Sequence, residues 1–255
     1  MLIVVSPSKT LEFEKPIINE SFTQPQFIKE ASGLIKLLRK FSVDQLMELM
    51  DISPKLARLN KERYYLWQPE FTAETARPGL FAFRGEVYTG LDADTLTPSD
   101  IGLAQSQLRI LSGLYGVLRP LDLIRPYRLE MGSSLAVPRY TNLYAFWQKK
   151  ITAKIREDLD RSNSNLLINL ASVEYFKAID TKKLKAEIIS PEFRERKAGT
   201  YKIVSIFAKK ARGMMTRFII QNEIYSEEHL QAFDDDGYCF NNRLSEKGKP
   251  VFTRG

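Results

Sequence analysis

The chain has 255 residues, of which 44% are hydrophobic and 27% are charged. A chain of this length and composition can bury a sizeable core, which excludes an intrinsically disordered protein. It contains no run of about 18 apolar residues that could span a bilayer, and its start, MLIVVSPSKT, lacks the features of a signal peptide. A single cysteine, Cys239, excludes an intramolecular disulfide, which fits a reducing compartment. We therefore expect a cytoplasmic protein with no membrane partner.

The positive charge is concentrated in one region of the chain. The 38 Lys and Arg residues outnumber the 31 Asp and Glu residues, which gives a net charge of +7. Residues 182–217 contain eleven basic and three acidic residues, a net charge of +8, so the remainder sums to about -1. A regional positive field favours a polyanionic partner, and nucleic acid is the default candidate.

The predicted elements are strands and helices mixed along the chain. Residues 2–6 are predicted to form a buried strand, and residues 24–40 carry apolar residues at helical spacing. Glycine and proline recur through residues 82–131, which predicts short elements joined by tight turns. A long helix is predicted over residues 142–160. Further strand patterns occur in LLINLAS, AEIISPEF, YKIVSIF, YCFNNRL and KPVFT.

These elements show no internal repeat and no linker, which predicts a single, intimately mixed α/β (α+β) domain over residues 1–255. LLINLAS leads into a helix capped by Ser172, and the C-terminal end of such a strand is the usual place for a ligand in α/β proteins. SPSKT, after the first strand, resembles the last residues of a phosphate-binding loop. Because it lacks the glycines of such a loop, we interpret it as a turn in which Ser8 or Thr10 acts as a capping residue.

Residues 208–219, AKKARGMMTRFI, predict a helix with one basic face. Gly213 lies within the basic arc, which spans roughly 160° of the helical wheel. Glycine in a helix interior costs about 1 kcal/mol relative to alanine, so it indicates close approach by a ligand or by another helix. We expect a backbone phosphate to approach at Gly213; the alternatives are helix packing and a solvated face. The cations of the arc are Lys209, Lys210, Arg212 and Arg217.

Residues 41–67 predict two helices joined by a short turn. Ser42 with Gln45 forms a capping box for the first helix, and Ser53 followed by proline begins the second. The pair resembles a helix-hairpin-helix, which binds the phosphates of one DNA strand without reading bases, although the usual glycines are absent. The expected phosphate ligands are Lys55 and Arg58. The alternative is an ordinary helical hairpin with its leucines, Leu46, Leu49, Leu56 and Leu59, in the core.

Four arginines in the turn-rich middle are further candidates for phosphate recognition: Arg109, Arg119, Arg125 and Arg128. The alternative is that they form structural ion pairs with Asp122 and Glu130.

Enzymatic chemistry is restricted by the residue types present. His229 is the one histidine, which excludes a histidine base and a multi-histidine metal site by counting. A nucleic-acid-processing enzyme would need a carboxylate beside a lysine as general acid and base. The candidates are Glu86, Asp122, Glu130 and Glu174, with Glu174 preferred because it follows a strand end. Direct iron binding would depend on carboxylates such as those of DDDG, residues 234–237. We expect no cofactor and no metal.

Several segments together resemble the peroxide-stress-resistance protein YaaA family of bacteria. They are SPSKT, FRGEVYTGL, LSGLYGVLRPLDLIRPYRLEMG, NLASVEYFK and FAKKARGMMTRFI, and the similarity is weakest at residues 132–140 and after Asp234. The resemblance implies a cytoplasmic protein that lowers unincorporated iron during peroxide stress. It also implies a family-specific mixed α/β fold with a helix-hairpin-helix and a basic cleft for double-stranded DNA, and it brings no catalytic residue.

The sequence thus predicts a monomer that binds double-stranded DNA through phosphates, almost independently of base sequence, and protects it from iron-generated radicals. A nucleic-acid-processing enzyme and a direct iron-sequestering protein remain the alternatives.

Overall fold

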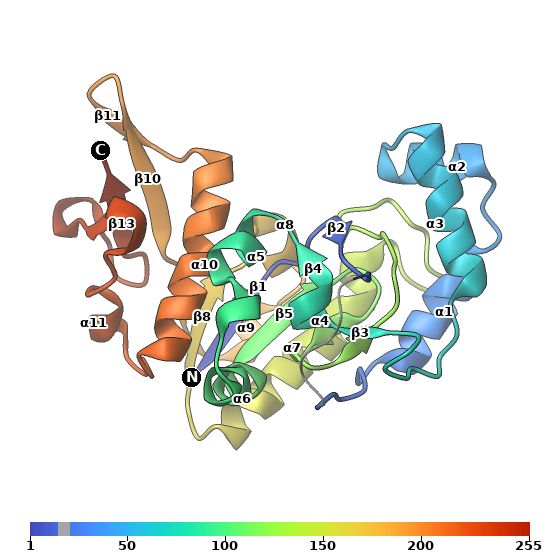
Figure 1. The fold of residues 1–255 in the computed structure, drawn as a ribbon, viewed down its shortest axis with the longest axis horizontal. Helices are drawn as coiled ribbons and strands as arrows, with labels where there is room; N and C mark the ends of the chain where they lie inside the picture. The colour runs from blue at the N-terminus through green and yellow to red at the C-terminus, as the bar shows by residue number, and fades with distance from the viewer. Residues whose placement is uncertain (15–20) are drawn as a thin grey trace.

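A five-stranded sheet forms the centre of the protein, which this computed structural model describes over residues 1–14 and 21–255 (Figure 1). The strand order is β6-β5-β1-β8-β9; β1 is parallel to β5 and β8, β8 is parallel to β9, and β6 is antiparallel to β5. All four residues of β1 are buried, as expected where helices cover both faces of parallel strands. The strands are β1 (Leu2–Val5), β5 (Leu108–Ser112), β6 (Gly116–Leu118), β8 (Leu166–Leu170) and β9 (Glu187–Ile189).

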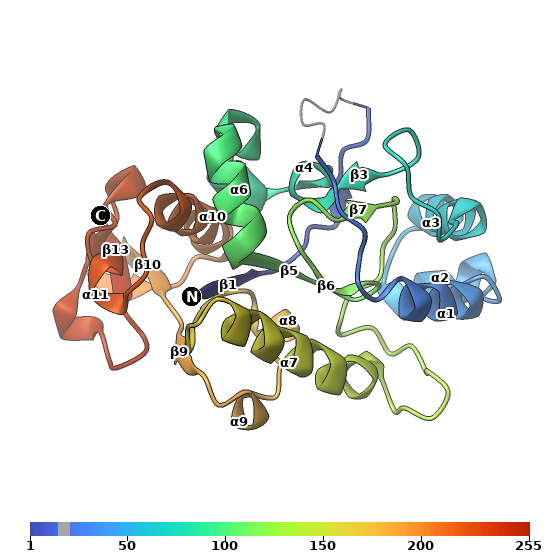
Figure 2. The same cartoon turned by 90° about the horizontal axis from the view of Figure 1, so that it is seen from below.

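Helices lie on both faces of this sheet (Figure 2). Helix α7 (Leu143–Arg161) covers one face, whereas α6 (Pro98–Gln107) and α10 (Ser205–Gln221) lie on the other. The side chain of Asn142 accepts a hydrogen bond from the amide of Ala145 at 2.9 Å and so caps α7. The helix predicted over residues 142–160 is therefore confirmed, and its buried side chains include Trp147, Ile151, Ile155 and Leu159.

Three N-terminal helices form one end of the molecule (Figure 1). They are α1 (Ile28–Leu38), α2 (Val43–Met50) and α3 (Pro54–Leu66). The capping box at Ser42 and the cap at Ser53 are both present, so the predicted pair of helices is confirmed. The predicted leucine core is only half right: Leu46 is buried, whereas Leu56 and Leu59 are each 39% exposed.

A second sheet forms the opposite end, with the order β11-β10-β13-β12 (Figure 1). The prediction of a strand through YKIVSIF is partly wrong, because the strand ends at Lys202 and α10 begins at Ser205. Ile206 and Phe207, the last apolar residues of this segment, lie in the first turn of α10 and are exposed. The elements of this end are β10 (Glu192–Lys197), β11 (Thr200–Lys202), β12 (Cys239–Phe240), β13 (Val251–Arg254) and α11 (Glu227–Leu230).

The segment between the two ends contains the predicted short elements. Helix α6 is an exception, because it is ten residues long. It begins with a capping box at Thr97 and a proline at its first position. The short elements are β2 (Thr10–Leu11) paired with β4 (Phe83–Arg84), β3 (Arg77–Pro78) paired with β7 (Leu123–Ile124), α4 (Gly79–Ala82), α5 (Glu86–Leu91), α8 (Val173–Phe176) and α9 (Thr181–Leu184). The mixed α/β fold class is therefore as predicted.

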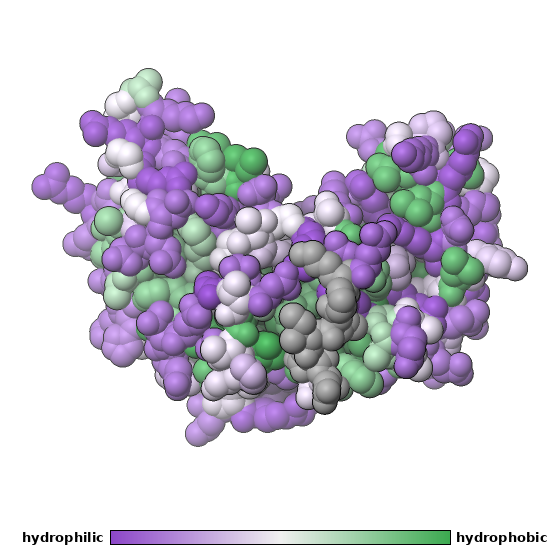
Figure 3. All heavy atoms as spheres, in the orientation of Figure 1, coloured by the Kyte–Doolittle hydropathy of each residue, from purple (hydrophilic) through white to green (hydrophobic). Residues whose placement is uncertain are grey.

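The two ends rise on either side of a hollow in the surface (Figure 3). The end with β10, β11 and the start of α10 lies on one side, and the end with α2 and α3 lies on the other (Figure 1). Within residues 1–14 and 21–255, no helix has the length and apolar character needed to cross a membrane.

Candidate functional site

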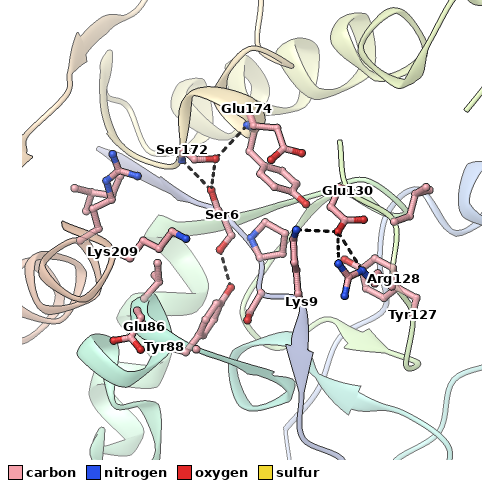
Figure 4. Close-up of a pocket in the computed structure, with 18 residues that line it drawn as sticks. Ser6, Lys9, Glu86, Tyr88, Tyr127, Arg128, Glu130, Ser172, Glu174 and Lys209 are labelled. Atoms are coloured by element: carbon pink, nitrogen blue, oxygen red, sulfur yellow. Dashed lines mark hydrogen bonds and ion pairs between the residues drawn. The ribbon is translucent and has the colours of Figure 1, made fainter. Parts of the chain in front are cut away.

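A pocket of about 400 Å³ lies at the carboxyl ends of β1 and β8 (Figure 4). The turn Ser6–Lys9, which follows β1, and Ser172, which follows β8, form part of its lining. Adjacent parallel strands end at the same edge of a sheet, and ligands bind outside these ends in open α/β folds. We call this feature the strand-end pocket; segments from α5, α8, α10 and residues 127–130 complete it.

Hydrogen bonds join the two strand ends at the base of the strand-end pocket (Figure 4). The Oγ of Ser6 accepts a hydrogen bond from the amide of Ser172 at 2.8 Å and donates to its Oγ at 3.2 Å. The hydroxyl of Tyr88 on α5 donates to the carbonyl of Ser6 at 3.1 Å. The predicted cap is also present, because Ser172 accepts from the amide of Tyr175 at 3.5 Å. The base of the pocket is thus fixed by contacts between segments far apart in sequence.

Glu130 is the centre of a charged group on one wall. Its Oε1 lies 3.1 Å from Nζ of Lys9 and 2.9 Å from Nη2 of Arg128. Its other oxygen, Oε2, is buried and has no hydrogen-bond partner among the described residues. Nearby, Oε1 of Glu174 accepts a hydrogen bond from the amide of Gly132 at 2.9 Å. This wall therefore presents a carboxylate whose two oxygens differ in their hydrogen bonding.

Helix α10 contributes two cations, Lys209 and Arg212, to another wall of the strand-end pocket. Neither side chain makes a hydrogen bond or an ion pair with a residue that the structure describes. Burial lowers the pKa of the Arg212 guanidinium, and the charge of Glu192 partly opposes that effect. Arginine remains charged despite such a shift, so this wall carries two positive charges available to an anion.

Three tyrosines line the pocket as neutral phenols. Burial, reinforced by neighbouring ionisable groups, raises the pKa of Tyr88 and Tyr175 well above the usual range. Burial likewise raises the pKa of Tyr127, although its hydrogen bond with Ser112 has the opposite effect. All three phenols therefore stay protonated at neutral pH.

The structure brings together three of the four carboxylates predicted for catalysis. Glu86, Glu130 and Glu174 all line the strand-end pocket, with Lys9 and Lys209 beside them. Asp122 does not line it: its carboxylate is 2.9 Å from Nη2 of Arg119.

The expected approach of a phosphate at Gly213 is wrong. Gly213 is buried against α5, and a Cβ at this position would lie 1.8 Å from the carbonyl oxygen of Val87. On α5, a Cβ at Gly90 would lie 2.1 Å from the carbonyl oxygen of Lys210. The two glycines thus let the backbones of α5 and α10 touch, which is the helix-packing alternative. The basic arc is divided by this contact.

Several predicted phosphate ligands already make contacts within the protein. Arg109 forms a buried ion pair with Asp158, Arg119 pairs with Asp122, and Arg128 pairs with Glu130. Lys210 lies 3.3 Å from a carboxylate oxygen of Asp236. Two further arginines donate to backbone carbonyls: Arg125 to those of Leu66 and Glu70, and Arg217 to those of Leu91 and Asp92.

Lys55 and Arg58, by contrast, are exposed on α3 and have no hydrogen bond or ion pair with any described residue. Their position satisfies one requirement of a phosphate-binding hairpin, and their binding role stays a prediction.

The pocket includes residues that sequence reasoning had set aside. Ser6 and Lys9 belong to SPSKT, which lacks the glycines of a phosphate-binding loop. The turn predicted for this segment is present, because the side chain of Ser8 accepts a hydrogen bond from the amide of Thr10 at 3.2 Å. Tyr175 carried no distinguishing signal, because a buried tyrosine is more often a core residue. Only the strand-to-helix pattern around Ser172 pointed to this edge of the sheet.

The arrangement is that of an α/β protein with a polar pocket at its strand ends. Residues 1–244 match the family described as peroxide stress protein YaaA. A UPF0246 protein of Aliivibrio fischeri strain ES114 is 53% identical over 254 residues, which cover 100% of this chain and 98% of the relative. A UPF0246 protein of Shewanella baltica strain OS195 is 50% identical over 254 residues, covering 100% and 99%. The chain belongs to the peroxide stress protein YaaA family.

Proposed function

We propose that the protein binds double-stranded DNA through its phosphates, without reading base sequence, and thereby limits damage from unincorporated iron during peroxide stress. Membership of a family described by peroxide stress supports the physiological setting. The net charge of +8 over residues 182–217 supports a polyanionic partner. A bound protein shields DNA from iron-generated radicals or competes with iron for the phosphates.

The observation that carries the proposal is that the helices at the two ends beside the hollow each carry cations without intramolecular partners among the described residues. Lys209 and Arg212 belong to α10 on one side, and Lys55 and Arg58 belong to α3 on the other (Figure 1). Cations that are not neutralised within the protein can replace the counterions of DNA phosphates. Arg119, Arg125, Arg217 and Lys210 contribute less, because their side chains already bond within the protein.

A charge-reversal experiment tests whether these cations bind the duplex. Lys55→Glu combined with Arg58→Glu should weaken binding of a labelled duplex strongly, since two attractive contacts become repulsive, while exposed positions leave stability almost unchanged. The matched control is Lys247→Glu combined with Lys249→Glu, which makes the same charge change at exposed positions outside α3, α10 and residues 182–217. Equal losses in both variants would show that net charge alone, and not the hairpin, governs binding.

A nucleic-acid-processing enzyme is the second candidate, and the contact between Lys9 and Glu130 at 3.1 Å favours it. A carboxylate beside a lysine in a pocket has the elements of general acid–base chemistry. The duplex assay therefore also follows strand integrity. Strand cleavage that Glu130→Gln abolishes would support the enzyme, and intact strands in the shifted complex would support the binding protein.

No comparable observation favours direct iron binding. The carboxylate of Asp236 is paired with Lys210 and lies 2.7 Å from Nη1 of Arg254. Among the residues that the structure describes, no three or more His, Cys, Asp or Glu side chains group in a way that could hold a metal ion.

A further inference from the structure

The strand-end pocket places unpaired cations and an unsatisfied carboxylate oxygen on different walls. Figure 4 shows Lys209 pointing into the pocket from α10, with Glu130, Lys9 and Arg128 across from it. Polar groups at a concave, partly buried site gain from pairing with a ligand that supplies the complementary charge or donor. The two walls therefore specify two different ends of one ligand.

The α10 wall is suited to a doubly charged anion. Lys209 and Arg212 are three residues apart on a helix, so both side chains lie on the same side of it. Arg212 is half-buried, and an anion is attracted more strongly by a cation that is shielded from water. Two adjacent cations, one of them a planar guanidinium, match the charge and the oxygen geometry of a phosphate group.

The opposite wall is suited to a hydrogen-bond donor. Oε1 of Glu174 accepts a hydrogen bond from the amide of Gly132, whereas its Oε2 has no hydrogen bond or ion pair with a described residue. An ionised carboxylate only accepts hydrogen bonds, so the matching ligand group is a hydroxyl or an amino group. A ligand that was negative throughout would be repelled here by Glu130 and Glu174.

We propose that the strand-end pocket binds a phosphate monoester of a hydroxyl- or amino-bearing organic group, as in a sugar phosphate or a nucleotide. The phosphate contacts Lys209 and Arg212, and the donor group contacts Oε2 of Glu174. The volume of about 400 Å³ lies within the range of small-molecule sites, roughly 300–1,000 Å³. This goes beyond the proposed duplex binding, because a free small molecule occupies the pocket whether or not the protein binds a duplex.

Calorimetric titration of the full chain with adenosine 5′-monophosphate tests the proposal. Lys209→Gln and Arg212→Gln should each raise the Kd by about tenfold or more, as expected for loss of a charge-assisted hydrogen bond. Lys210→Gln is the matched control, because it makes the same charge change next to Lys209 but removes a side chain that pairs with Asp236. The control should leave the Kd unchanged. Absence of binding to the unaltered protein at millimolar ligand, or an equal loss in the control, would overturn the proposal.

A second titration tests the donor end. Glu174→Gln should weaken the binding of adenosine 5′-monophosphate more than the binding of inorganic phosphate, because only the nucleotide carries an organic donor group to the far wall. An equal effect on both ligands would contradict the assignment of Glu174.

Two further experiments identify the source of the phosphate and test this inference separately from the proposed duplex binding. If a strand end is the source, a 5′-phosphorylated oligonucleotide should compete with adenosine 5′-monophosphate better than its unphosphorylated form; equal competition assigns the pocket to free nucleotides. The variant with Lys55→Glu and Arg58→Glu should lose duplex affinity and keep nucleotide affinity. Nucleotide binding without duplex binding would refute the proposed function alone, and duplex binding without binding of either phosphate monoester would refute this inference alone.

Discussion

Gly213→Ala tests how closely α10 packs on α5. Alanine favours a helix interior over glycine by about 1 kcal/mol, so helix propensity predicts stabilisation. The structure predicts the opposite, because the added Cβ would lie 1.8 Å from the carbonyl oxygen of Val87 and 2.7 Å from the amide nitrogen of Leu91. Both atoms belong to the backbone of α5, so only separation of the helices relieves the contact. Overpacking costs about 1–3 kcal/mol or more, and a backbone clash lies at the upper end, which leaves a net loss of about 2 kcal/mol.

Gly33→Ala is the matched control for this substitution. Gly33 lies within α1, and a Cβ there meets no heavy atom within 4 Å, so only the helix propensity changes. Thermal unfolding measures both variants: for a chain of this size, a loss of about 2 kcal/mol lowers the Tm by roughly 4–8 °C, and a gain of about 1 kcal/mol raises it by roughly 2–4 °C. A Gly213→Ala protein as stable as the unaltered chain, beside a stabilised Gly33→Ala protein, would refute the proposed close packing.

Three further predictions concern titration, a buried ion pair and iron. Burial raises the pKa of Tyr64, Tyr88, Tyr115, Tyr127 and Tyr175. Their stabilising contribution is present below the ordinary tyrosine pKa of about 10 and is lost above it, by about 1 kcal/mol per tyrosine between pH 10 and pH 11. Circular dichroism should therefore show loss of stability as the pH rises past about 10, and a stability unchanged to pH 11 would argue against these buried phenols. Although burial alone would raise the pKa of Asp158, the contacts with Arg109 at 2.7 Å and with Lys154 lower it. Asp158→Asn should thus lower the free energy of unfolding, measured with urea, by about 3 kcal/mol at pH 7. The loss should become progressively smaller below about pH 4, where the carboxylate of the unfolded chain is protonated. A loss of stability that does not depend on pH would contradict the ionic account. Protein purified from peroxide-stressed cells should carry no stoichiometric iron, since imidazole and thiolate ligands are nearly lacking. A metal analysis that finds about one iron per chain, lost when Asp234, Asp235 and Asp236 become Asn, would overturn that expectation.

Local signals in the sequence predicted local structure well. The caps at Ser42, Ser53 and Ser172 are all present, because a cap depends on residues three positions apart in the chain. The apolar run of β1 and the periodicity of α7 were equally readable, since each element buries the face that its own pattern defines.

Partners distant in sequence were not predictable in this way. The helical wheel placed Gly213 inside a basic arc, but it could not show that Val87, more than a hundred residues earlier, packs on that spot. The same limit applies to Arg217, whose guanidinium donates to the carbonyls at the end of α5. The strand-end pocket likewise arises only when β1 and β8 pair, which places Ser6 beside Ser172.

The salt dependence of duplex binding tests the central claim most directly. If Lys55, Arg58, Lys209 and Arg212 each neutralise one phosphate, log affinity against log salt concentration should fall with a slope of about -3.6, since each contact releases about 0.9 counterion. Unrelated duplex sequences should give the same line, because phosphates carry no sequence information. A slope near zero, or affinities that differ by more than about tenfold among unrelated duplexes at one salt concentration, would contradict phosphate-mediated, sequence-independent binding.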